Sequence, residues 1–274
     1  MHPYIVIFGQ KIQTYYLCAA GAGLLGAALS AAALKRNRQG AWAYILPLLV
    51  IGSALIGARV LNFLIYPGAY THGFHLWTFS YRKLSLMGGL VAGTAVIVLY
   101  CCFRKARLPL IADTLTLPAA AGIMLLKLGC FLNGCCFGKP TDGPFGMIFP
   151  ANKSGYGFIN SLQLVKAKSP VVHPTQLYEI AGALAAITAA IVLPRVLKMK
   201  EGSRAAIFAA LFSAARWIVL PLRELPYDRQ IVTAFYPCFY AALICCAAGF
   251  LMKHGFSWKQ KQTGQHPQHE TRQI

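Results

Sequence analysis

The stretch that decides the fold runs from residue 108 to residue 138 and reads LPLIADTLTLPAAAGIMLLKLGCFLNGCCFG. Its first part is apolar, and at about 1.5 Å per residue a helix of this length crosses about 30 Å of hydrocarbon. Its second part carries Lys127, Asn133 and three cysteines before the chain turns into glycines and prolines. Charged side chains are costly within a membrane and usually line a cavity or a pathway. The stretch therefore predicts a membrane helix that ends in a polar site.

The composition of the whole chain is that of a membrane protein. Of its 274 residues, 57% are hydrophobic and 12% are charged, whereas about 25% are charged in a typical soluble domain. Apolar segments recur without an alternating strand pattern, so helices are expected, because they satisfy their own backbone hydrogen bonds in lipid. The expected spans are residues 14–34, 41–66, 84–103, 108–138, 173–194, 205–225 and 232–252. The predicted fold is an all-α polytopic membrane protein with about seven transmembrane helices.

The net charge of +19 first suggests a nucleic-acid partner, but its distribution argues against one. More than half of the 26 Lys and Arg residues lie in the segments that follow the first, third, fifth and seventh expected spans. Positively charged loops remain in the cytoplasm. The N-terminus is therefore predicted outside and the C-terminus in the cytoplasm. Topology and anionic lipid head groups explain the charge, and no nucleic acid is expected.

The chain is expected to form a single membrane-embedded domain, residues 1–274, because no repeat, low-complexity segment or linker divides it. Residues 139–172 are the expected outer loop, and residues 253–274 are the expected cytoplasmic tail. No basic region follows Met1 directly, and the first apolar segment runs into KRNR. The first span is therefore expected to be retained, not removed as a signal peptide.

Charged residues in the spans are the first candidates for a functional site. Lys127 and Arg216 have apolar residues on both sides, whereas Arg59, Arg223 and Glu179 are close enough to span ends to reach toward water. With only 7 Asp and Glu in the chain, Lys127 and Arg216 are expected to lack an acidic partner. A phospholipid phosphate suits the arginine fork and the lysine charge. A structural ion pair or simple snorkelling is the alternative for each residue.

Glycines and a helix start offer backbone contacts as well. Gly88, Gly89, Gly134 and Gly138 either permit close helix packing or let backbone amides approach a ligand. In HPTQLYE, Pro174 suits the first turn of a helix, and the free amides at that start could face an anion. The preceding His173 is a cap, a structural hydrogen-bonding group or an acid–base group.

Three cysteines of the opening stretch, Cys130, Cys135 and Cys136, allow several interpretations. They could fill space, form a disulfide with one another, bind zinc, or act as thiol nucleophiles or transient carriers. Their spacing matches no strong zinc pattern, and no histidine is adjacent. Packing is therefore favoured, and neither a metal nor a cofactor is expected.

Taken together, several motifs resemble those of prolipoprotein diacylglyceryl transferases. The main ones are KLGCFLNGCCFG (127–138), HPTQLYE (173–179) and AARWIVLPLR (214–223), with GARVLNFLIY (57–66), MGGL (87–90) and Tyr15 as further similar features. HPTQLYE is matched in full, and the likeness covers nearly the whole chain. The resemblance implies a multi-pass enzyme of the bacterial inner (plasma) membrane. Such enzymes transfer the diacylglyceryl group of phosphatidylglycerol to the lipobox cysteine thiol in the signal peptide of an exported prolipoprotein.

The same resemblance implies roles for individual residues of this chain. The implied catalytic residues are Arg216, Lys127, His173 and Tyr15. The implied lipid-binding residues are Asn133, Gly138, Gly88, Gly89, Arg59, Arg223, Gln176, Tyr178 and Glu179. It implies no metal site and no cofactor.

The chain departs from the family pattern where the chemistry is expected. Lys127 replaces an arginine, Cys130 an asparagine and Cys135 a glutamate, and Met87 stands where the family has a histidine that could exchange a proton. The lipid-holding part is therefore expected to persist and the proton-handling part to be altered. The alternatives are a related transferase with another acceptor and a non-catalytic lipid-binding membrane protein.

Overall fold

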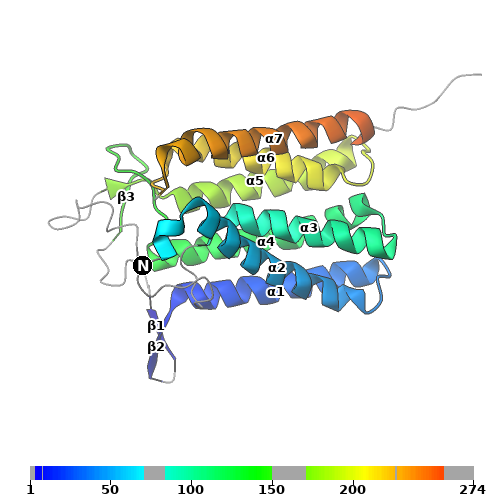
Figure 1. Cartoon of the computed structure of the whole chain (residues 1–274), viewed down its shortest axis with the longest axis horizontal. Coiled ribbons are helices and arrows are strands. Elements are labelled where there is room, and N and C mark those ends of the chain that lie inside the picture. The colour runs from blue at the N-terminus through cyan, green and yellow to red at the C-terminus, as the bar shows by residue number, and fades with distance from the viewer. Residues whose placement is uncertain (1–3, 8, 71–83, 150–170, 226, 256–274) are drawn as a thin grey trace, which may run out of the picture.

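The structure is a computed structural model that describes residues 4–7, 9–70, 84–149, 171–225 and 227–255 (Figure 1). Seven of its helices are long and apolar enough to cross a membrane. They are α1 (Thr14–Arg36), α2 (Trp42–Ile65), α3 (Leu86–Arg104), α4 (Leu108–Asn133), α5 (Thr175–Val196), α6 (Ser203–Val219) and α7 (Tyr236–Phe250). The predicted all-α polytopic fold is confirmed. Which end faces the cytoplasm stays a prediction.

Short elements extend the long helices or lie at their ends. A 3-10 turn, Leu220–Leu222, continues α6, and π-turns at Ile231–Phe235 and Leu251–Gly255 extend α7. Two antiparallel strand pairs are β1 (Tyr4–Ile7) with β2 (Gln10–Gln13), and β3 (Met147–Ile148) with β4 (Val171–Val172). Within the predicted outer loop and tail, residues 150–170 and 256–274 lie outside the described residues.

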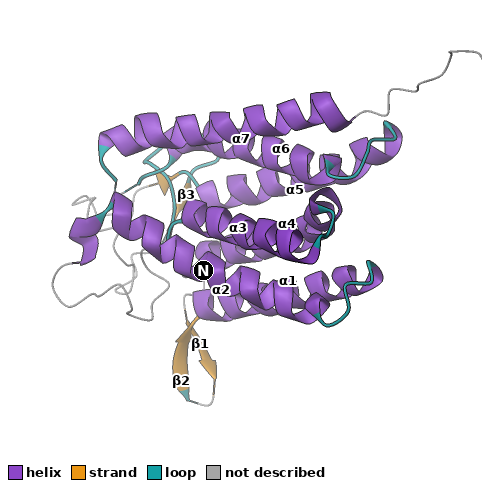
Figure 2. Cartoon of the chain, turned by 45° about the vertical axis from the view of Figure 1, so that its right-hand side comes forward, coloured by secondary structure: helices purple, strands orange, loops and turns teal. Residues whose placement is uncertain are grey.

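The helix α4 occupies the centre of the bundle. It contacts α1, α3, α5 and α6, while α2 packs on α3 and α7 packs on α6. In Figure 2 the helices run side by side, and the β1–β2 hairpin extends from the end at which α1 begins. The last turn of α4, the first turn of α5 and the last turn of α6 lie at that same end (Figure 1). Residues at the end of α4, the start of α5 and the end of α6 are thus neighbours in space.

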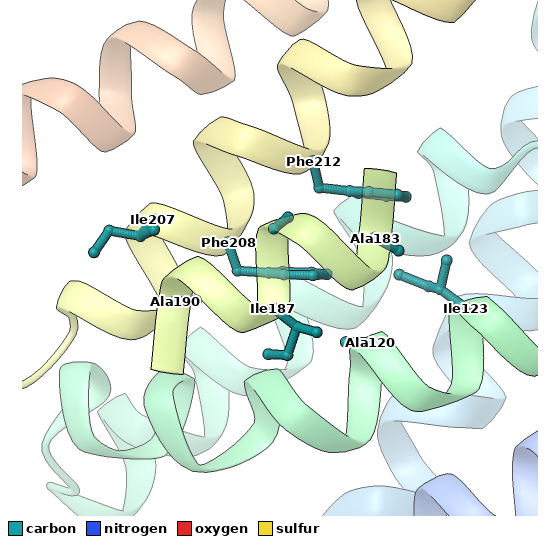
Figure 3. Close-up of a cluster of buried hydrophobic side chains, with 9 residues drawn as sticks. Ala120, Ile123, Ala183, Ile187, Ala190, Ile207, Phe208 and Phe212 are labelled. Atoms are coloured by element: carbon teal, nitrogen blue, oxygen red, sulfur yellow. The ribbon is translucent and has the colours of Figure 1, made fainter. Parts of the chain in front are cut away.

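A core of small and aromatic residues fixes α4, α5 and α6 relative to one another (Figure 3). Ala120 of α4 and Ala183 of α5 are fully buried and let the helices approach closely. Phe208 and Phe212, one turn apart on α6, stack with their ring centroids 5.5 Å apart and fill the remaining space. This packing determines which side chains of the three helices meet at their ends.

Near the start of α4, Asp113 binds the first turn of α6. Gly202, in a left-handed conformation with φ of 90°, donates its amide to Asp113 Oδ2 at 2.8 Å, and the Ala205 amide donates to Oδ1 at 2.8 Å. These are two of the amides that a helix start leaves without an intrahelical partner. The carboxylate also lies at the positive end of the helix dipole.

The paired glycines of α3 lie in its contact with α2. A Cβ at Gly88 would collide with the backbone oxygen of Gly57, and a Cβ at Gly89 would lie 3.1 Å from the backbone oxygen of Ala54. Close packing of two helices therefore accounts for both glycines. Their predicted part in lipid binding remains untested.

The fourth span is shorter than the sequence predicted, because α4 ends at Asn133 and not at residue 138. Gly134 adopts the left-handed conformation, φ 69°, that commonly terminates helices. Cys136 has a φ of 63°, also left-handed. Cys135 and Cys136 therefore lie in a loop that folds back on the last turn of the helix.

Candidate active site

One buried carboxylate and three cations form the centre of the candidate site. Glu179, in the second turn of α5, is 2% exposed. Its Oε2 pairs with Lys127 Nζ of α4 and, at 2.8 Å, with Arg216 Nη1 of α6. Its Oε1 lies 3.2 Å from Arg223 Nη1, just beyond α6. This four-residue group, called the Glu179 cluster below, contains more positive than negative charge.

The cluster corrects two expectations. Lys127 and Arg216 do have an acidic partner, so the expectation of none was wrong. Glu179 and Arg223 do not snorkel outward, because their side chains are only 2% and 14% exposed. The physical reason is shared: a carboxylate makes a buried cation less costly, and Glu179 contacts three cations at once, although its single charge offsets only one of them.

The side chain of Arg216 is held on two further sides. Its Nε donates to the Tyr240 hydroxyl of α7 at 3.2 Å, and its guanidinium lies 5.9 Å from the centre of the Phe212 ring. Tyr240 packs in a buried cluster that includes Met87, the residue at the position where the resemblance places a histidine. Tyr240 was missed in the sequence, although a tyrosine hydroxyl within an apolar span needs a polar partner.

A second polar chain connects α2 to the start of the seventh span. Asn62, 3% exposed, accepts from the Tyr70 hydroxyl at 2.9 Å and donates to the Tyr227 oxygen at 3.1 Å. Arg59 hydrogen-bonds Tyr70. Burial raises the pKa of Tyr227, which keeps this hydroxyl neutral beside Arg223. Asn62 and Tyr227 were not predicted, although an amide in an apolar helix was an available signal.

The loop after α4 is joined to α5 and α6 by backbone pairing. The Gly138 amide donates to the His173 oxygen at 2.8 Å, and the Lys139 amide donates to the Leu222 oxygen at 2.8 Å. A Cβ at Gly138 would collide with that Leu222 oxygen and lie 2.7 Å from Thr175 Cγ2. The Gly138 amide is therefore used within the chain. Glycine is needed at this position because the backbone segments around Gly138 and Leu222 approach so closely that a side chain has no room.

The HPTQLYE motif uses its polar groups mainly to hold this loop. Thr175 Oγ1 donates to the Cys136 oxygen at 2.8 Å, and Gln176 Nε2 donates to the Cys135 oxygen at 2.6 Å. Both side chains are 1% exposed. The motif thus positions the three-cysteine segment next to the start of α5.

Two other groups of the motif are bonded within the chain as well. His173 Nδ1 lies 3.3 Å from the Tyr178 hydroxyl. The Thr175 amide donates to the His173 oxygen at 2.9 Å, and the Leu177 amide donates to the Pro174 oxygen at 2.9 Å. The sequence predicted that amides at this helix start could bind an anion. These two amides already have hydrogen-bond partners within the chain.

Sulfur atoms from three cysteines meet beside the Glu179 cluster. The Sγ atoms of Cys130, Cys135 and Cys136 all lie within 4.8 Å of one another. Hydrogen bonds from the other two thiols lower the pKa of Cys136, and the charges of Lys127 and Arg223 act in the same direction. The sequence left open whether these cysteines come together, and the folding-back of the loop brings them together.

The remaining predicted residues border this region. Asn133, the last residue of α4, hydrogen-bonds the Cys135 thiol. Tyr15, in the first turn of α1, packs near Gly129, where an added Cβ would lie 3.7 Å from its ring. Arg59 is connected to the region through the Tyr70–Asn62–Tyr227 chain.

The chain that carries this site is similar in sequence to known proteins. The family model described as prolipoprotein diacylglyceryl transferase matches residues 3–254. The chain belongs to this family. Among its relatives, the phosphatidylglycerol–prolipoprotein diacylglyceryl transferase of Synechococcus sp. (strain CC9902) is 28% identical over 229 residues, which is 79% of this chain and 78% of that protein. The resemblance predicted from HPTQLYE and its companion motifs is thus confirmed.

Two further relatives carry the same name. That of Parasynechococcus marenigrum (strain WH8102) is 30% identical over 65% of this chain and 62% of its own length. That of Geobacter sulfurreducens (strain ATCC 51573 / DSM 12127 / PCA) is 31% identical over 61% of this chain and 56% of its own length. Family membership thus applies to the bundle as a whole, while the role of each residue in the Glu179 cluster stays a prediction.

Proposed function

We propose that this chain transfers the diacylglyceryl group of phosphatidylglycerol to the lipobox cysteine thiol of exported prolipoproteins, the reaction for which its relatives are named. The observation that carries the residue assignment is the Glu179 cluster. One buried cation, Arg216, and two partly exposed ones, Lys127 and Arg223, share a single buried carboxylate. An anionic phosphate is the partner that the surplus charge calls for, because uncompensated charge in a buried site is costly.

The cluster offers a phosphate both charge and hydrogen-bond donors. A guanidinium has five N–H donors, and Tyr240 and Glu179 are the partners of Arg216 among the described residues. Lys127 and Arg223, 13% and 14% exposed, form the more accessible edge of the cluster. We assign phosphate binding to Arg216 with Lys127 and Arg223 beside it.

Transfer consists of one bond exchange. The thiol sulfur attacks the glycerol carbon that bears the phosphate, a C–S bond forms, and the C–O bond breaks. Glycerol phosphate leaves with the electron pair, and the thiol proton passes to water. Negative charge grows on the phosphate during this step, and fixed positive groups aimed at growing charge lower the barrier. Arg216 is the best-placed group for that task, because its position is set from three sides.

Localisation follows from the same proposal. We assign the chain to the bacterial inner membrane as one embedded domain, with its N-terminus and the α4–α5 loop outside. The support is the basic charge of the segments at the opposite end. Cysteine-accessibility labelling checks the orientation, and a cytoplasmic position of the α4–α5 loop would contradict it.

The direct test uses purified full-length protein in detergent with phosphatidylglycerol and a lipobox peptide, read by mass spectrometry for the thioether adduct. We expect the adduct with phosphatidylglycerol and none with a peptide whose cysteine is replaced by serine. Phosphatidylcholine, a zwitterionic donor, is the matched control and should give little product. Lipid binding without any adduct would favour a non-catalytic lipid-binding protein, and an adduct on a different acceptor would favour a redirected transferase.

A further inference from the structure

Three sulfur atoms next to the Glu179 cluster carry an inference that rests on the transferase function proposed above. We propose that Cys130, Cys135 and Cys136 bind one zinc ion through their thiolates, and that its fourth coordination position receives the lipobox thiol. The ion would hold that thiol as a thiolate next to the phosphate-binding cations. Its role would be to activate the acceptor.

The first support is the distance between the sulfurs. All three Sγ atoms lie within 4.8 Å of one another. Zinc–thiolate bonds of about 2.3 Å in tetrahedral or trigonal arrangement place sulfurs about 3.8–4.0 Å apart. Small side-chain rotations therefore complete the site. Space-filling alone does not require the three sulfur atoms to lie close to one another.

The second support is that the backbone carrying the sulfurs is fixed in place. The Cys135 amide donates to the Cys130 oxygen at 3.0 Å, which folds the loop back on the last turn of α4. The Cys135 and Cys136 oxygens accept from the buried side chains of Gln176 and Thr175 at 2.6 and 2.8 Å. Ligands held in this way lose little freedom when they bind a metal.

Charge is the third support. Zinc with three thiolates has a net charge of about −1, and a bound substrate thiolate adds another negative charge. Two positive side chains of the Glu179 cluster are close to the sulfurs: Lys127 lies about one helical turn before Cys130 in α4, and the backbone of Arg223 pairs with Gly138 of the loop that carries Cys135 and Cys136. The surplus positive charge of the cluster and the negative charge of the zinc complex would therefore stabilise each other.

An open fourth position follows from the ligand set. Within the described part of the chain, no histidine, aspartate or glutamate joins the three cysteines. Zinc sites with three protein ligands keep the fourth position for water or substrate, whereas structural sites are closed by four. A thiol that coordinates the metal loses its proton, and metal coordination is one of the ways in which proteins activate nucleophiles.

The site would supply what the chain lacks at residue 87. Met87 is 2% exposed and has no proton to exchange. In the proposed step the peptide S–H releases its proton to water as the sulfur binds zinc. The sulfur then attacks the glycerol carbon, a C–S bond forms, the C–O bond breaks, and glycerol phosphate leaves with the electron pair. No oxidant or reductant is required.

The first experiment measures metal without reference to activity. Full-length protein, purified in detergent under reducing conditions, is analysed for zinc by mass spectrometry and for zinc–sulfur bonds by X-ray absorption. We expect about one zinc per chain with sulfur ligands at about 2.3 Å. Replacement by Co²⁺ should give thiolate-to-cobalt charge-transfer absorption, and adding the lipobox peptide should change that spectrum, whereas its Cys→Ser form should not.

Serine variants test whether zinc binding depends on these three cysteines and not on other cysteines of the chain. Cys130→Ser, Cys135→Ser and Cys136→Ser should each reduce the zinc content and the cobalt absorption, while Cys102→Ser, on the exposed surface of α3, should change neither. Transfer by the zinc-free protein should fall by about tenfold or more, because a free thiol with a pKa near 8.5 is only a few per cent thiolate at neutral pH. Added zinc should restore the wild type and not the Cys135→Ser protein.

The inference and the proposed function fail in different ways. Zinc-free protein that transfers at the full rate, or a disulfide between two of these cysteines in the active protein, would overturn the zinc site and leave the transferase function intact. Zinc bound through all three cysteines together with a peptide-dependent cobalt spectrum, but without any adduct, would support the thiol-binding site and contradict the transferase function.

Discussion

Two carboxylates at opposite ends of the bundle show two uses of an acidic group in an apolar protein. Asp113, near the start of α4, accepts hydrogen bonds from two backbone amides at the start of α6. Glu179, near the start of α5, faces three cationic side chains. The partners of Asp113 are neutral backbone amides, which are part of the helix itself. Glu179 has one negative charge against three positive ones, so the first site is balanced within the fold and the second has a surplus of positive charge.

The largest expected effect tests this difference directly. Arg216→Ala should lower transfer by about 10²-fold or more, because it removes a donor directed at growing negative charge. Folding should persist, since Glu179 keeps Lys127 and Arg223 as partners. Arg216→Lys should recover only part of the rate, because the fork is lost. The thioether adduct assay measures the rate.

Arg195→Ala is the matched control, because Arg195 is exposed and its Nη1 donates only to the Ile191 oxygen of its own helix among the described residues. A wild-type rate for Arg216→Ala would show that Arg216 serves only to offset the charge of Glu179. Its role would then be structural, like that of Asp113 at the start of α6.

A second prediction concerns the loop that places the site next to α6. Gly138→Ala should lower transfer by about tenfold to 10²-fold, because the new Cβ must displace the Leu222 backbone and thereby Arg223. Gly26→Ala is the control, since a Cβ at Gly26 of α1 meets nothing within 4 Å. Equal rates for both alanine variants would mean that the loop–α6 pairing has no part in transfer.

The third prediction has a smaller effect. Lys127→Arg should change the rate by only a few-fold, because the charge opposite Glu179 is kept, whereas Lys127→Ala should lower it by about tenfold, or about 1.4 kcal/mol. Rates measured against phosphatidylglycerol concentration separate weaker lipid binding from slower transfer. If Lys127→Arg is as slow as Lys127→Ala, the shape of lysine matters more than its charge.

The smallest effect on transfer is expected at the other end of the bundle. Asp113→Asn removes the charge that faces the α6 helix start and should lower the free energy of unfolding by about 1 kcal/mol. The transfer rate per folded molecule should not change, because Asp113 lies away from the Glu179 cluster. Thermal unfolding in detergent and the adduct assay measure the two quantities. A loss of transfer rate without a loss of stability would show that Asp113 affects the Glu179 cluster from the opposite end of the bundle.

Much of the fold was predictable because lipid is a demanding solvent. Partition into hydrocarbon depends on hydropathy summed over about twenty consecutive residues, so the seven spans were visible in the sequence and are confirmed. The end of α4 was misplaced by five residues, because hydropathy does not register the left-handed Gly134 that stops the helix. Tyr240 and Asn62 were missed because neither is charged, although both are polar groups in apolar helices.

The sequence by itself determined the solvent, the helices, the family and the residue types with unusual chemistry. The pairing of those residues was decided by the tertiary structure. Lys127, Glu179 and Arg216 are far apart in the chain, and they meet because the core of α4, α5 and α6 sets the rotation of each helix. The three sulfurs meet because a left-handed residue after α4 turns the loop back toward Cys130. Such contacts depend on packing between distant segments, which local sequence patterns do not specify.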